Sequence, residues 1–145
     1  MQFEPKARDF KARVRASFAA QGMMNTLQAK LEKVDAGQCK ITAPIIPKTG
    51  QPHGFAHAGL SFSIGDSAAG YAALSLMDSL SEVVTAEIKI NLIAPAKGDH
   101  LEAIGKVIRP GNRLFTVQSD VYAIDGSIRT HIAILLGTMV AVRTA

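Results

Sequence analysis

Apolar residues recur with a helical period near the start of the chain. Phe10, Val14 and Phe18 stand four residues apart with basic residues between them, and Gly22 follows as a stop signal. This spacing predicts an amphipathic N-terminal helix over residues 6–21. Its charges are typical of a solvated face rather than of a ligand site.

Two short segments with alternating apolar positions come next. They cover residues 27–31 and 39–45, and the turn sequence DAGQ at residues 35–38 lies between them. The alternation and the turn predict two antiparallel strands joined by a short hairpin. Residues 46–54 are rich in Pro and Gly, which predicts a loop.

A long apolar segment, residues 57–77, is rich in Gly, Ala, Ser and Leu. It predicts a helix of roughly 30 Å at 1.5 Å per residue. Its only Asp, Glu, Lys or Arg is Asp66. A helix that is apolar on nearly all sides must be enclosed by the rest of the fold.

Alternation with a period of two predicts four further strands after this helix. They are expected at residues 85–93, 100–108, 114–123 and 132–142. In the first of them, Ile88 and Ile90 belong to one face and Thr85 to the opposite face. The last is an apolar run, and we expect both of its faces to be buried.

The order of these elements predicts the α+β class, with one antiparallel β-sheet curled around a long central α-helix. A composition of 48% apolar and 19% charged residues is typical of an ordinary globular protein. At this length, residues 1–145 are expected to form a single domain.

The net charge of +4 comes from basic residues that are dispersed along the chain rather than clustered. This favours binding of a small anion over a nucleic acid, and no nucleic-acid partner is expected.

The single cysteine, Cys39, cannot form an internal disulfide, which permits a reducing compartment. No segment is typical of a signal peptide or a membrane helix, so we expect a cytoplasmic protein without a membrane partner.

Asp66 is a charged residue in an apolar context. At helical spacing its neighbours are Phe62, Ser63, Ala69 and Gly70, none of which can pair with a charge. Burial of an unpaired carboxylate costs several kcal/mol, which proteins tolerate mainly at functional sites. The alternative is a carboxylate that is paired by a strand or a second subunit and only fixes packing, and both interpretations stay open.

The sequence HGFAHAG, residues 53–59, leads into this helix with small residues that let a ligand approach the backbone closely. The first N–H groups of a helix have no intrahelical partner, so they can bind a carbonyl oxygen as negative charge develops on it. Together with Asp66 they form half of an acyl-transfer centre.

The predicted helix contains three glycines, Gly59, Gly65 and Gly70. Each lowers helix stability by about 1 kcal/mol relative to Ala. Close approach of another backbone, such as that of a dimer partner, would offset this cost.

His53 and His57 have the spacing of a metal-binding pair on a helix. No third ligand is evident, and the Pro-His-Gly context places His53 in a loop, so neither a metal site nor a cofactor is expected. His57 is interpreted either as a residue at the helix start that bonds backbone groups or as a residue with a direct chemical role.

The segment HGFAHAG, followed by GDSAAGYAAL, resembles the signature of PaaI-type hotdog-fold acyl-CoA thioesterases, in which an HGG sequence precedes an Asp in an L-A-D-x-A context. Downstream, INLIAPAKGDHLEAIGKV is also similar to the pattern of that family. The resemblance covers residues 24–142. It implies the hotdog fold, an antiparallel β-sheet wrapped around a long central α-helix.

By position in the motif, the resemblance implies that Asp66 is the catalytic carboxylate, either as a general base on water or as a nucleophile on the thioester carbonyl. The backbone N–H of Ala58 falls at the oxyanion-binding position. Thr85 falls at a position that helps to place the water, and Gln51 falls where many members have Asn. Two departures from the family, Ala58 for Gly and Gln51 for Asn, concern rate and substrate range rather than reaction class.

The implied reaction is hydrolysis of an acyl- or aryl-acyl-CoA to free acid and CoA. His57 and Gly59, on either side of Ala58, are expected to contact the substrate. Arg109 and Arg113 flank a turn and are candidates for binding the CoA phosphates, with a plain solvated turn as the alternative.

Subunits of this family pair their sheets edge to edge, each active site uses residues from both subunits, and dimers commonly form tetramers. The resemblance therefore implies a homodimer that assembles into a homotetramer. One alternative function is a non-catalytic hotdog acyl-CoA-binding protein, in which a buried carboxylate would be an unexplained cost. The other is a hotdog hydratase or dehydratase, which would need a His paired with a carboxylate across the acyl chain.

Overall fold

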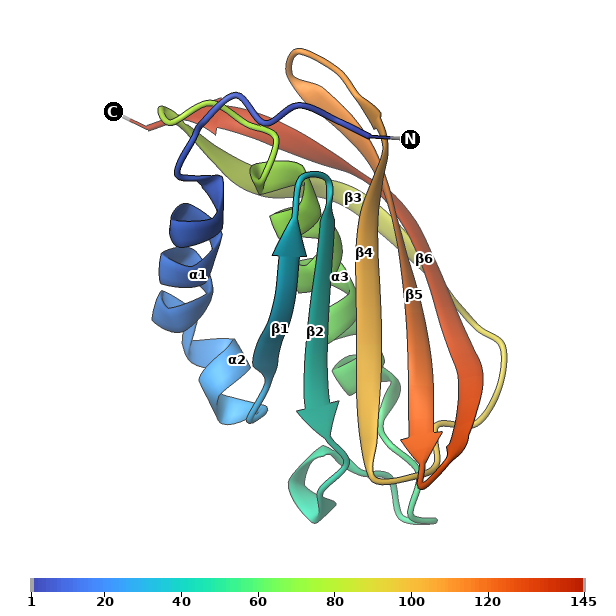
Figure 1. The fold of residues 1–145 in the computed structure, drawn as a ribbon. Helices are drawn as coiled ribbons and strands as arrows, with labels where there is room; N and C mark the ends of the chain where they lie inside the picture. Colours follow the sequence, from blue (N-terminus) through green and yellow to red (C-terminus); the bar gives the residue numbers. More distant parts are fainter. Residues whose placement is uncertain (1, 145) are drawn as a thin grey trace.

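A six-stranded antiparallel sheet curls around one long helix in the computed structural model, which describes residues 2–144 (Figure 1). The helices are α1 (Phe10–Ala20), α2 (Gly22–Thr26) and α3 (Ala58–Leu74), and a short 3-10 turn covers Pro47–Thr49. The strands are β1 (Lys30–Asp35), β2 (Gln38–Pro44), β3 (Ser81–Leu92), β4 (His100–Pro110), β5 (Leu114–Asp125) and β6 (Ile128–Arg143). Their order across the sheet is β1-β2-β4-β5-β6-β3. The predicted hotdog arrangement, a sheet around a central helix, is confirmed.

The N-terminal helix is shorter than predicted and is followed by a second helix. α1 begins only at Phe10, and Gln21 has an extended backbone (φ −81°, ψ 104°) that separates α1 from α2. Gly22 therefore begins a helix, where the sequence predicted only a stop signal. Val14 of α1 and Met24 of α2 are both buried. These short helices are stabilised by packing against the core, because helices of this length are marginal on their own.

The first strand begins later than the alternation at residues 27–31 predicts. Leu27 is the C-cap residue of α2, Gln28 has a left-handed backbone (φ 56°), and β1 starts at Lys30. The Leu27 side chain is buried. Its apolar character therefore serves the packing of α2, and the prediction of a strand there is wrong.

The central helix packs against five of the six strands, from β2 to β6. The helix lies very close to β4, where a Cβ on Gly105 would overlap with the backbone carbonyl of Ala68. Gly105 therefore allows α3 to lie directly on the sheet. The helix ends at Leu74, and the chain reaches Met77, its predicted end, through tighter turns. No helix within residues 2–144 has the length and apolar character needed to cross a membrane.

Gly65 of α3 has a close neighbour in its own chain. A Cβ on Gly65 would lie 2.8 Å from a methyl group of Leu135 on β6, so the missing side chain makes room for that leucine. The expectation that a dimer partner accounts for this glycine is wrong. Gly70 differs, because a Cβ there would meet nothing closer than the Met139 side chain at 3.9 Å.

The alternation expected for β4 and β5 is present in the burial of their residues. Buried residues alternate along both strands, namely Leu101, Ala103, Gly105, Val107, Phe115, Val117, Ser119 and Val121. The prediction for β6 is wrong, because its two faces differ within this chain. Leu135 and Met139 are buried, whereas Leu136 is 54% exposed. One face of β6 covers α3, and the other lies on the outer surface of the sheet.

A β-bulge in β3 changes the face on which its residues lie. Thr85 pairs with the buried Met139 of β6 and Ile88 with the buried Gly137, while the register skips Ala86 between them. One extra residue shifts the alternation by one position. Thr85 and Ile88 therefore both face α3, and the prediction that they lie on opposite faces is wrong.

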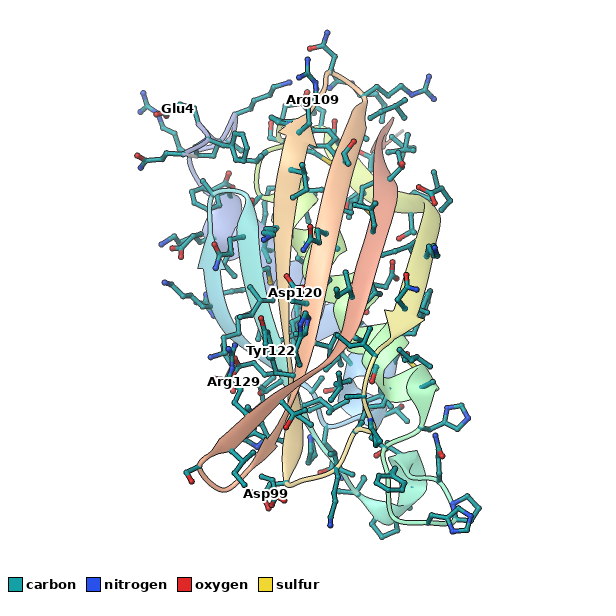
Figure 2. All side chains as sticks on the ribbon, turned by 90° about the vertical axis from the view of Figure 1, so that its right-hand side faces the viewer. Glu4, Asp99, Arg109, Asp120, Tyr122 and Arg129 are labelled. Carbon is teal, nitrogen blue, oxygen red and sulfur yellow. The ribbon has the colours of Figure 1, made fainter. Side chains whose placement is uncertain are left out.

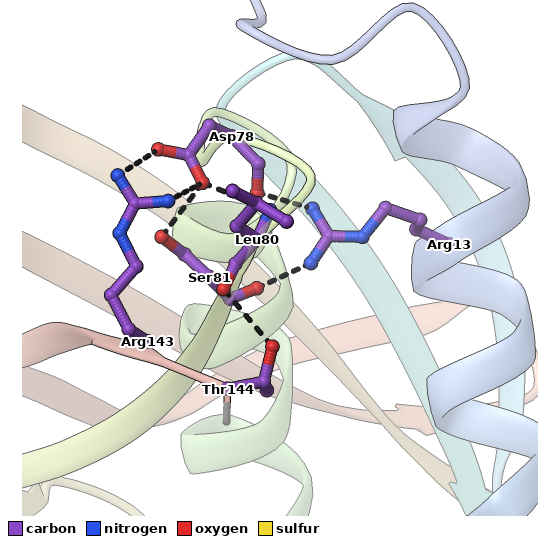
Figure 3. A network of polar contacts seen from close by, with 6 residues as sticks. All are labelled: Arg13, Asp78, Leu80, Ser81, Arg143 and Thr144. Atoms are coloured by element: carbon purple, nitrogen blue, oxygen red, sulfur yellow. Dashed lines mark hydrogen bonds and ion pairs between the residues drawn. The ribbon is translucent and has the colours of Figure 1, made fainter.

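A polar network ties α1 and the end of β6 to the turn between α3 and β3 (Figure 3). The Arg13 guanidinium donates hydrogen bonds to the carbonyl oxygens of Asp78, at 2.8 Å, and of Ser81. Arg143 of β6 forms an ion pair with the Asp78 carboxylate, with an N–O distance of 3.3 Å. These contacts fix the N-terminal helix beside the start of β3.

Candidate active site

Asp66 lies on the side of α3 that faces β3. Its Oδ1 accepts a 2.8 Å hydrogen bond from the Thr85 hydroxyl, which the bulge at Ala86 turns toward the helix. Burial raises the pKa of the Asp66 carboxyl above its ordinary value, and the hydrogen bond from Thr85 opposes that rise. Within residues 2–144 no group donates a hydrogen bond to Oδ2. This oxygen can therefore accept a proton from a water molecule.

A cavity of about 140 Å³ opens beside this carboxylate, between α1, α3 and β3. Its lining residues are Ser17, Gln21, Asp66, Ser67, Gly70, Tyr71, Glu82, Val83 and Thr85. Most of these side chains are polar, which is unusual for a ligand pocket, since such pockets are predominantly apolar. We refer to it as the Asp66 cavity.

Four side chains of the Asp66 cavity form a hydrogen-bonded group. Gln21 Nε2 donates to the Tyr71 hydroxyl at 2.6 Å, and the Ser17 hydroxyl lies 3.2 Å from the same oxygen. The Ser67 hydroxyl donates to Gln21 Oε1 at 3.4 Å. Burial raises the pKa of Tyr71, so its hydroxyl keeps its proton. The sequence offers no signal for this group, because its members come from elements about 50 residues apart.

The start of α3 leaves one backbone N–H open. His57 is the N-cap of α3, and its Nδ1 accepts a 2.8 Å hydrogen bond from the Gly59 N–H. The Leu60 N–H donates to the His57 carbonyl oxygen at 3.0 Å. The N–H of Ala58 has no acceptor among residues 2–144. It is the donor that this helix start, with its positive dipole end, offers to an outside ligand.

Backbone hydrogen bonds hold the loop before α3 in place. The N–H of Ala56 donates to the carbonyl oxygen of Ala96 at 2.8 Å, and that of His57 donates to Thr49 at 2.9 Å. Gln51 begins the preceding turn, and its Nε2 lies 3.4 Å from the Ala56 carbonyl oxygen. The Ala58 N–H is therefore presented by a fixed backbone.

A larger cavity of about 500 Å³ lies beside Ala58, and we refer to it as the Ala58 cavity. Its lining residues are Gln51, Phe55, Ala56, Ala58, Ser61, Leu92, Ile93, Ala94, Pro95, Ala96 and Ile132. The lining is predominantly apolar. An apolar cavity with an open amide at its wall suits a chain-like ligand whose carbonyl oxygen accepts that N–H.

The structure divides the predicted catalytic residues into two pairs. Asp66 and Thr85 line one cavity, and Ala58 and Gln51 line the other. Ala58 and Asp66 are eight residues apart on α3, which is about 12 Å along the axis at 1.5 Å per residue. One carbonyl group therefore cannot contact both residues within a single chain.

Arg109 and Arg113 lie far from the start of α3. They flank the exposed β4–β5 turn, which lies beside Leu76, just beyond the C-terminal end of α3. Figure 2 shows Arg109 at one end of the sheet and Asp99 at the opposite end. Within residues 2–144 neither arginine forms an ion pair, and neither lines the Asp66 cavity or the Ala58 cavity. Contact with the CoA phosphates remains a prediction for both.

The two histidines with metal-pair spacing have different surroundings. His53 is exposed in the turn before α3, whereas Nδ1 of His57 accepts the Gly59 N–H. In the part of the chain that the structure describes, no three His, Cys, Asp or Glu side chains lie close enough together to hold a metal ion.

Comparison with known proteins points to thioesterases and esterases. The family model that matches residues 53–129 is described as the thioesterase superfamily. A Saccharolobus solfataricus protein named "Putative esterase SSO1253" is 34% identical over 121 residues, which cover 83% of this chain and 78% of that protein.

Solved structures are similar over nearly the whole chain. A thioesterase family protein from Silicibacter pomeroyi is 35% identical and superposes with a TM-score of 0.91, covering 93% of this chain and 99% of that chain. The PaaI protein from the phenylacetic acid degradation operon of E. coli superposes with a TM-score of 0.82 at 19% identity, covering 97% of this chain and 96% of that chain. At 19% identity the likeness is one of fold alone.

Proposed function

The chain belongs to the thioesterase superfamily and is a thioester hydrolase, and we propose that its substrate is an acyl- or aryl-acyl-CoA, hydrolysed to free acid and CoA. The observation that carries this proposal is the Asp66 carboxylate, which is half-buried, lies beside a cavity and, among residues 2–144, accepts a hydrogen bond from Thr85 alone. A structural role does not require a charge there, because a neutral amide could accept the same hydrogen bond without the cost of burying a carboxylate.

In the proposed mechanism Asp66 acts as the general base. Thr85 holds Oδ1, so Oδ2 takes a proton from water while the water oxygen attacks the thioester carbonyl carbon. The carbonyl oxygen becomes an oxyanion that accepts the Ala58 N–H. The C–S bond then breaks, and the proton passes from Asp66 to the leaving CoA thiolate. Because its pKa is raised, this carboxylate is a stronger base than an exposed one.

Each proposed site combines Asp66 of one subunit with the Ala58 N–H of the other. Two α3 helices that run antiparallel would bring the start of one beside Asp66 of the other, which resolves the separation of about 12 Å within one chain. The surface of α3 that borders β3 supports this arrangement, since Gly59, Phe62, Ser63 and Asp66 form one partly exposed stripe along the helix.

The edge of the sheet supports the same arrangement. β3 is the last strand of the sheet and has 12 residues, so one of its edges pairs with no other strand within residues 2–144. Proteins normally cover or interrupt an edge of that length. Pairing with β3 of a second copy would continue the sheet and leave both α3 helices on the same side. This homodimer, and its assembly into a homotetramer, are part of the proposal.

The two cavities suggest how the substrate lies. The Ala58 cavity of one subunit, which is larger and apolar, would take the pantetheine arm. The Asp66 cavity of the other subunit would take the acyl group. His57 and Gly59 border the thioester in this arrangement. Gly59 keeps the cap intact, since a Cβ there would lie 3.0 Å from His57 Nδ1. A cytoplasmic location is proposed because the single cysteine, Cys39, is buried and cannot form an internal disulfide, which permits a reducing compartment.

Thiol release from a panel of acyl- and aryl-acyl-CoA thioesters tests the proposed function. We expect Asp66→Asn to lower kcat by about 10²–10⁴-fold, because the amide keeps the shape of the side chain but cannot accept the proton. The same substitution at the exposed Asp9 is the matched control and should leave the rate unchanged.

Two results would contradict this proposal in different ways. Full activity of Asp66→Asn would exclude the mechanism. No thiol release from any thioester would favour a non-catalytic acyl-CoA-binding protein, and water addition to an enoyl-CoA without thiol release would favour a hydratase.

A further inference from the structure

Ser61 is a buried polar residue in the wall of the Ala58 cavity. It lies in the first turn of α3 and is only 1% exposed. Apart from Gln51, the other residues of this lining have apolar side chains or expose only backbone. A ligand in the Ala58 cavity therefore meets the Ser61 hydroxyl on an otherwise largely hydrocarbon wall.

The Ser61 hydroxyl has no hydrogen-bond partner among residues 2–144, unlike the other two serines of α3. The Ser63 hydroxyl donates to the Gly59 carbonyl oxygen at 2.8 Å, and the Ser67 hydroxyl donates to Gln21 Oε1 at 3.4 Å. A buried hydroxyl without a partner lowers the stability of the fold. Alanine would fill nearly the same space without this cost, so packing alone does not explain a serine at this position.

The side of α3 that carries Ser61 faces β6. Gly65, one turn further along the helix, packs against a leucine of β6, and Ile132 of the same strand lines the cavity with Ser61. The Ile132 carbonyl oxygen already accepts the N–H groups of Ile93 and Ala94, at 2.9 and 3.3 Å. A carbonyl oxygen has two lone pairs, so this acceptor is saturated and does not compete for the Ser61 hydroxyl.

Ser61 lies close to the open N–H of Ala58. The two residues are three positions apart on α3, which makes them neighbours on its surface, about 4.5 Å along the axis at 1.5 Å per residue. In a CoA thioester, the N–H of the amide nearest the sulfur lies about 5 Å from the thioester carbonyl carbon, across four bonds. A thioester whose carbonyl oxygen accepts the Ala58 N–H therefore brings this amide within reach of Ser61.

We propose that Ser61 is a substrate-binding residue whose hydroxyl oxygen accepts the N–H of the pantetheine amide nearest the sulfur. This inference rests on the proposed function. The amide loses its hydrogen bonds to water when it enters an apolar cavity, and Ser61 replaces one of them. Bound at both Ala58 and Ser61, the thioester is held at two points on one rigid helix. This fixes its carbonyl carbon for attack by the water that Asp66 of the other subunit activates.

A matched pair of thioesters tests this inference. One is the acyl-CoA that the thioester panel shows to be hydrolysed fastest, and the other is its analogue with an ester oxygen in place of that amide N–H. We expect kcat/KM of the wild type to be roughly tenfold higher for the amide, because the ester has no proton to donate to Ser61. Ser61→Ala should bring the two values to within about twofold by lowering that of the amide. The same substitution at Ser79, which is exposed and outside both cavities, should keep the rate and the preference.

The melting temperature of the free enzyme separates substrate binding from a structural role. Loss of an unpartnered hydroxyl should leave the melting temperature of Ser61→Ala unchanged or higher, and a clear decrease would argue for a structural role. Ser61→Cys is a second variant of similar size with a weakly hydrogen-bonding thiol, and it should also reduce the preference.

Two kinetic results would overturn the inference. They are equal kcat/KM values for the two thioesters in the wild type and a preference for the amide that persists in both Ser61 variants. Failure to hydrolyse any thioester of the full panel would instead count against the proposed function, which keeps the two failures distinguishable.

Discussion

The Thr85 hydroxyl lies 2.8 Å from Oδ1 of Asp66, and it reaches this position because the bulge at Ala86 puts Thr85 on the inner face of β3. The hydrogen bond favours the ionised carboxylate, while burial favours the protonated form. The balance between them determines how readily Asp66 exchanges a proton with water.

Replacing Thr85 by Val should change the pH dependence of catalysis. Loss of the hydroxyl removes the interaction that lowers the pKa of Asp66, so this pKa rises further. A general base must be ionised, so activity falls as the pH falls through its pKa, and the acid limb of the kcat/KM–pH profile should move to higher pH. On the plateau we expect a loss of no more than about tenfold, the effect of one hydrogen bond.

Thr85→Ser is the control for this profile, because it keeps the hydroxyl. Its acid limb should coincide with that of the wild type. An acid limb that stays in place in Thr85→Val would mean that the hydrogen bond does not control the ionisation of Asp66.

Ala58→Pro should remove the proposed oxyanion donor with little effect on the fold. Ala58 is the first residue of α3, where proline is well tolerated, and His57 before it has φ −64° and ψ 143°, a conformation suited to a residue before proline. We expect kcat to fall by about 10²–10³-fold, the effect of losing one such donor. Ala58→Val adds bulk but keeps the N–H and should be much less impaired. Equal rates for the two variants would point to a steric effect instead.

Mixing two inactive variants should restore activity if each site spans two subunits. A heterodimer of Asp66→Asn and Ala58→Pro subunits contains one site with both changes and one site with neither. Steady-state assays after unfolding and refolding of a 1:1 mixture should therefore recover about a quarter of wild-type activity, because half of the dimers are mixed and each has one intact site. A mixture that stays as inactive as its components would place Asp66 and Ala58 of the same chain in one site.

Asp66→Asn should stabilise the fold at neutral and higher pH. Burial raises the pKa of Asp66 in the folded state, so its contribution to stability is full below the unfolded-state pKa and is lost as the pH rises through the folded-state pKa. Asn does not ionise and avoids this loss. We expect a melting temperature at pH 8 that is higher on the order of 1–5 °C, with a difference that shrinks in acid. A lower melting temperature at pH 8 would argue against a net cost of the charged carboxylate.

Gly105→Ala should be strongly destabilising, because the new Cβ would overlap with the Ala68 carbonyl of α3. We expect a loss of about 2–4 kcal/mol in the free energy of unfolding, measured by urea denaturation. Gly22→Ala is the matched control in α2, where a Cβ meets no atom within 4 Å, and it should stabilise the protein by up to about 1 kcal/mol. Similar losses in both variants would mean that the approach of α3 to β4 is not the critical contact.

Several features of the site follow from local sequence patterns. The apolar segment 57–77 identifies α3, and a single charge within it identifies Asp66. The alternation in β4 and β5 predicts their buried faces correctly, because period-two patterns need no knowledge of distant residues. The same rule fails for Thr85, since it cannot detect the bulge at Ala86. Only the resemblance to a known family placed Thr85 in the site.

Local sequence patterns are sufficient to identify the central helix, most strands and the carboxylate within that helix, because these features depend on residues a few positions apart. Other features become visible only in the folded chain. They are the inward direction of Thr85, the Ala58 N–H that stays open while His57 caps α3 through Gly59, and the hydrogen bond between Gln21 and Tyr71. Strand register and contacts between elements far apart in the chain control these features, and no local period encodes them.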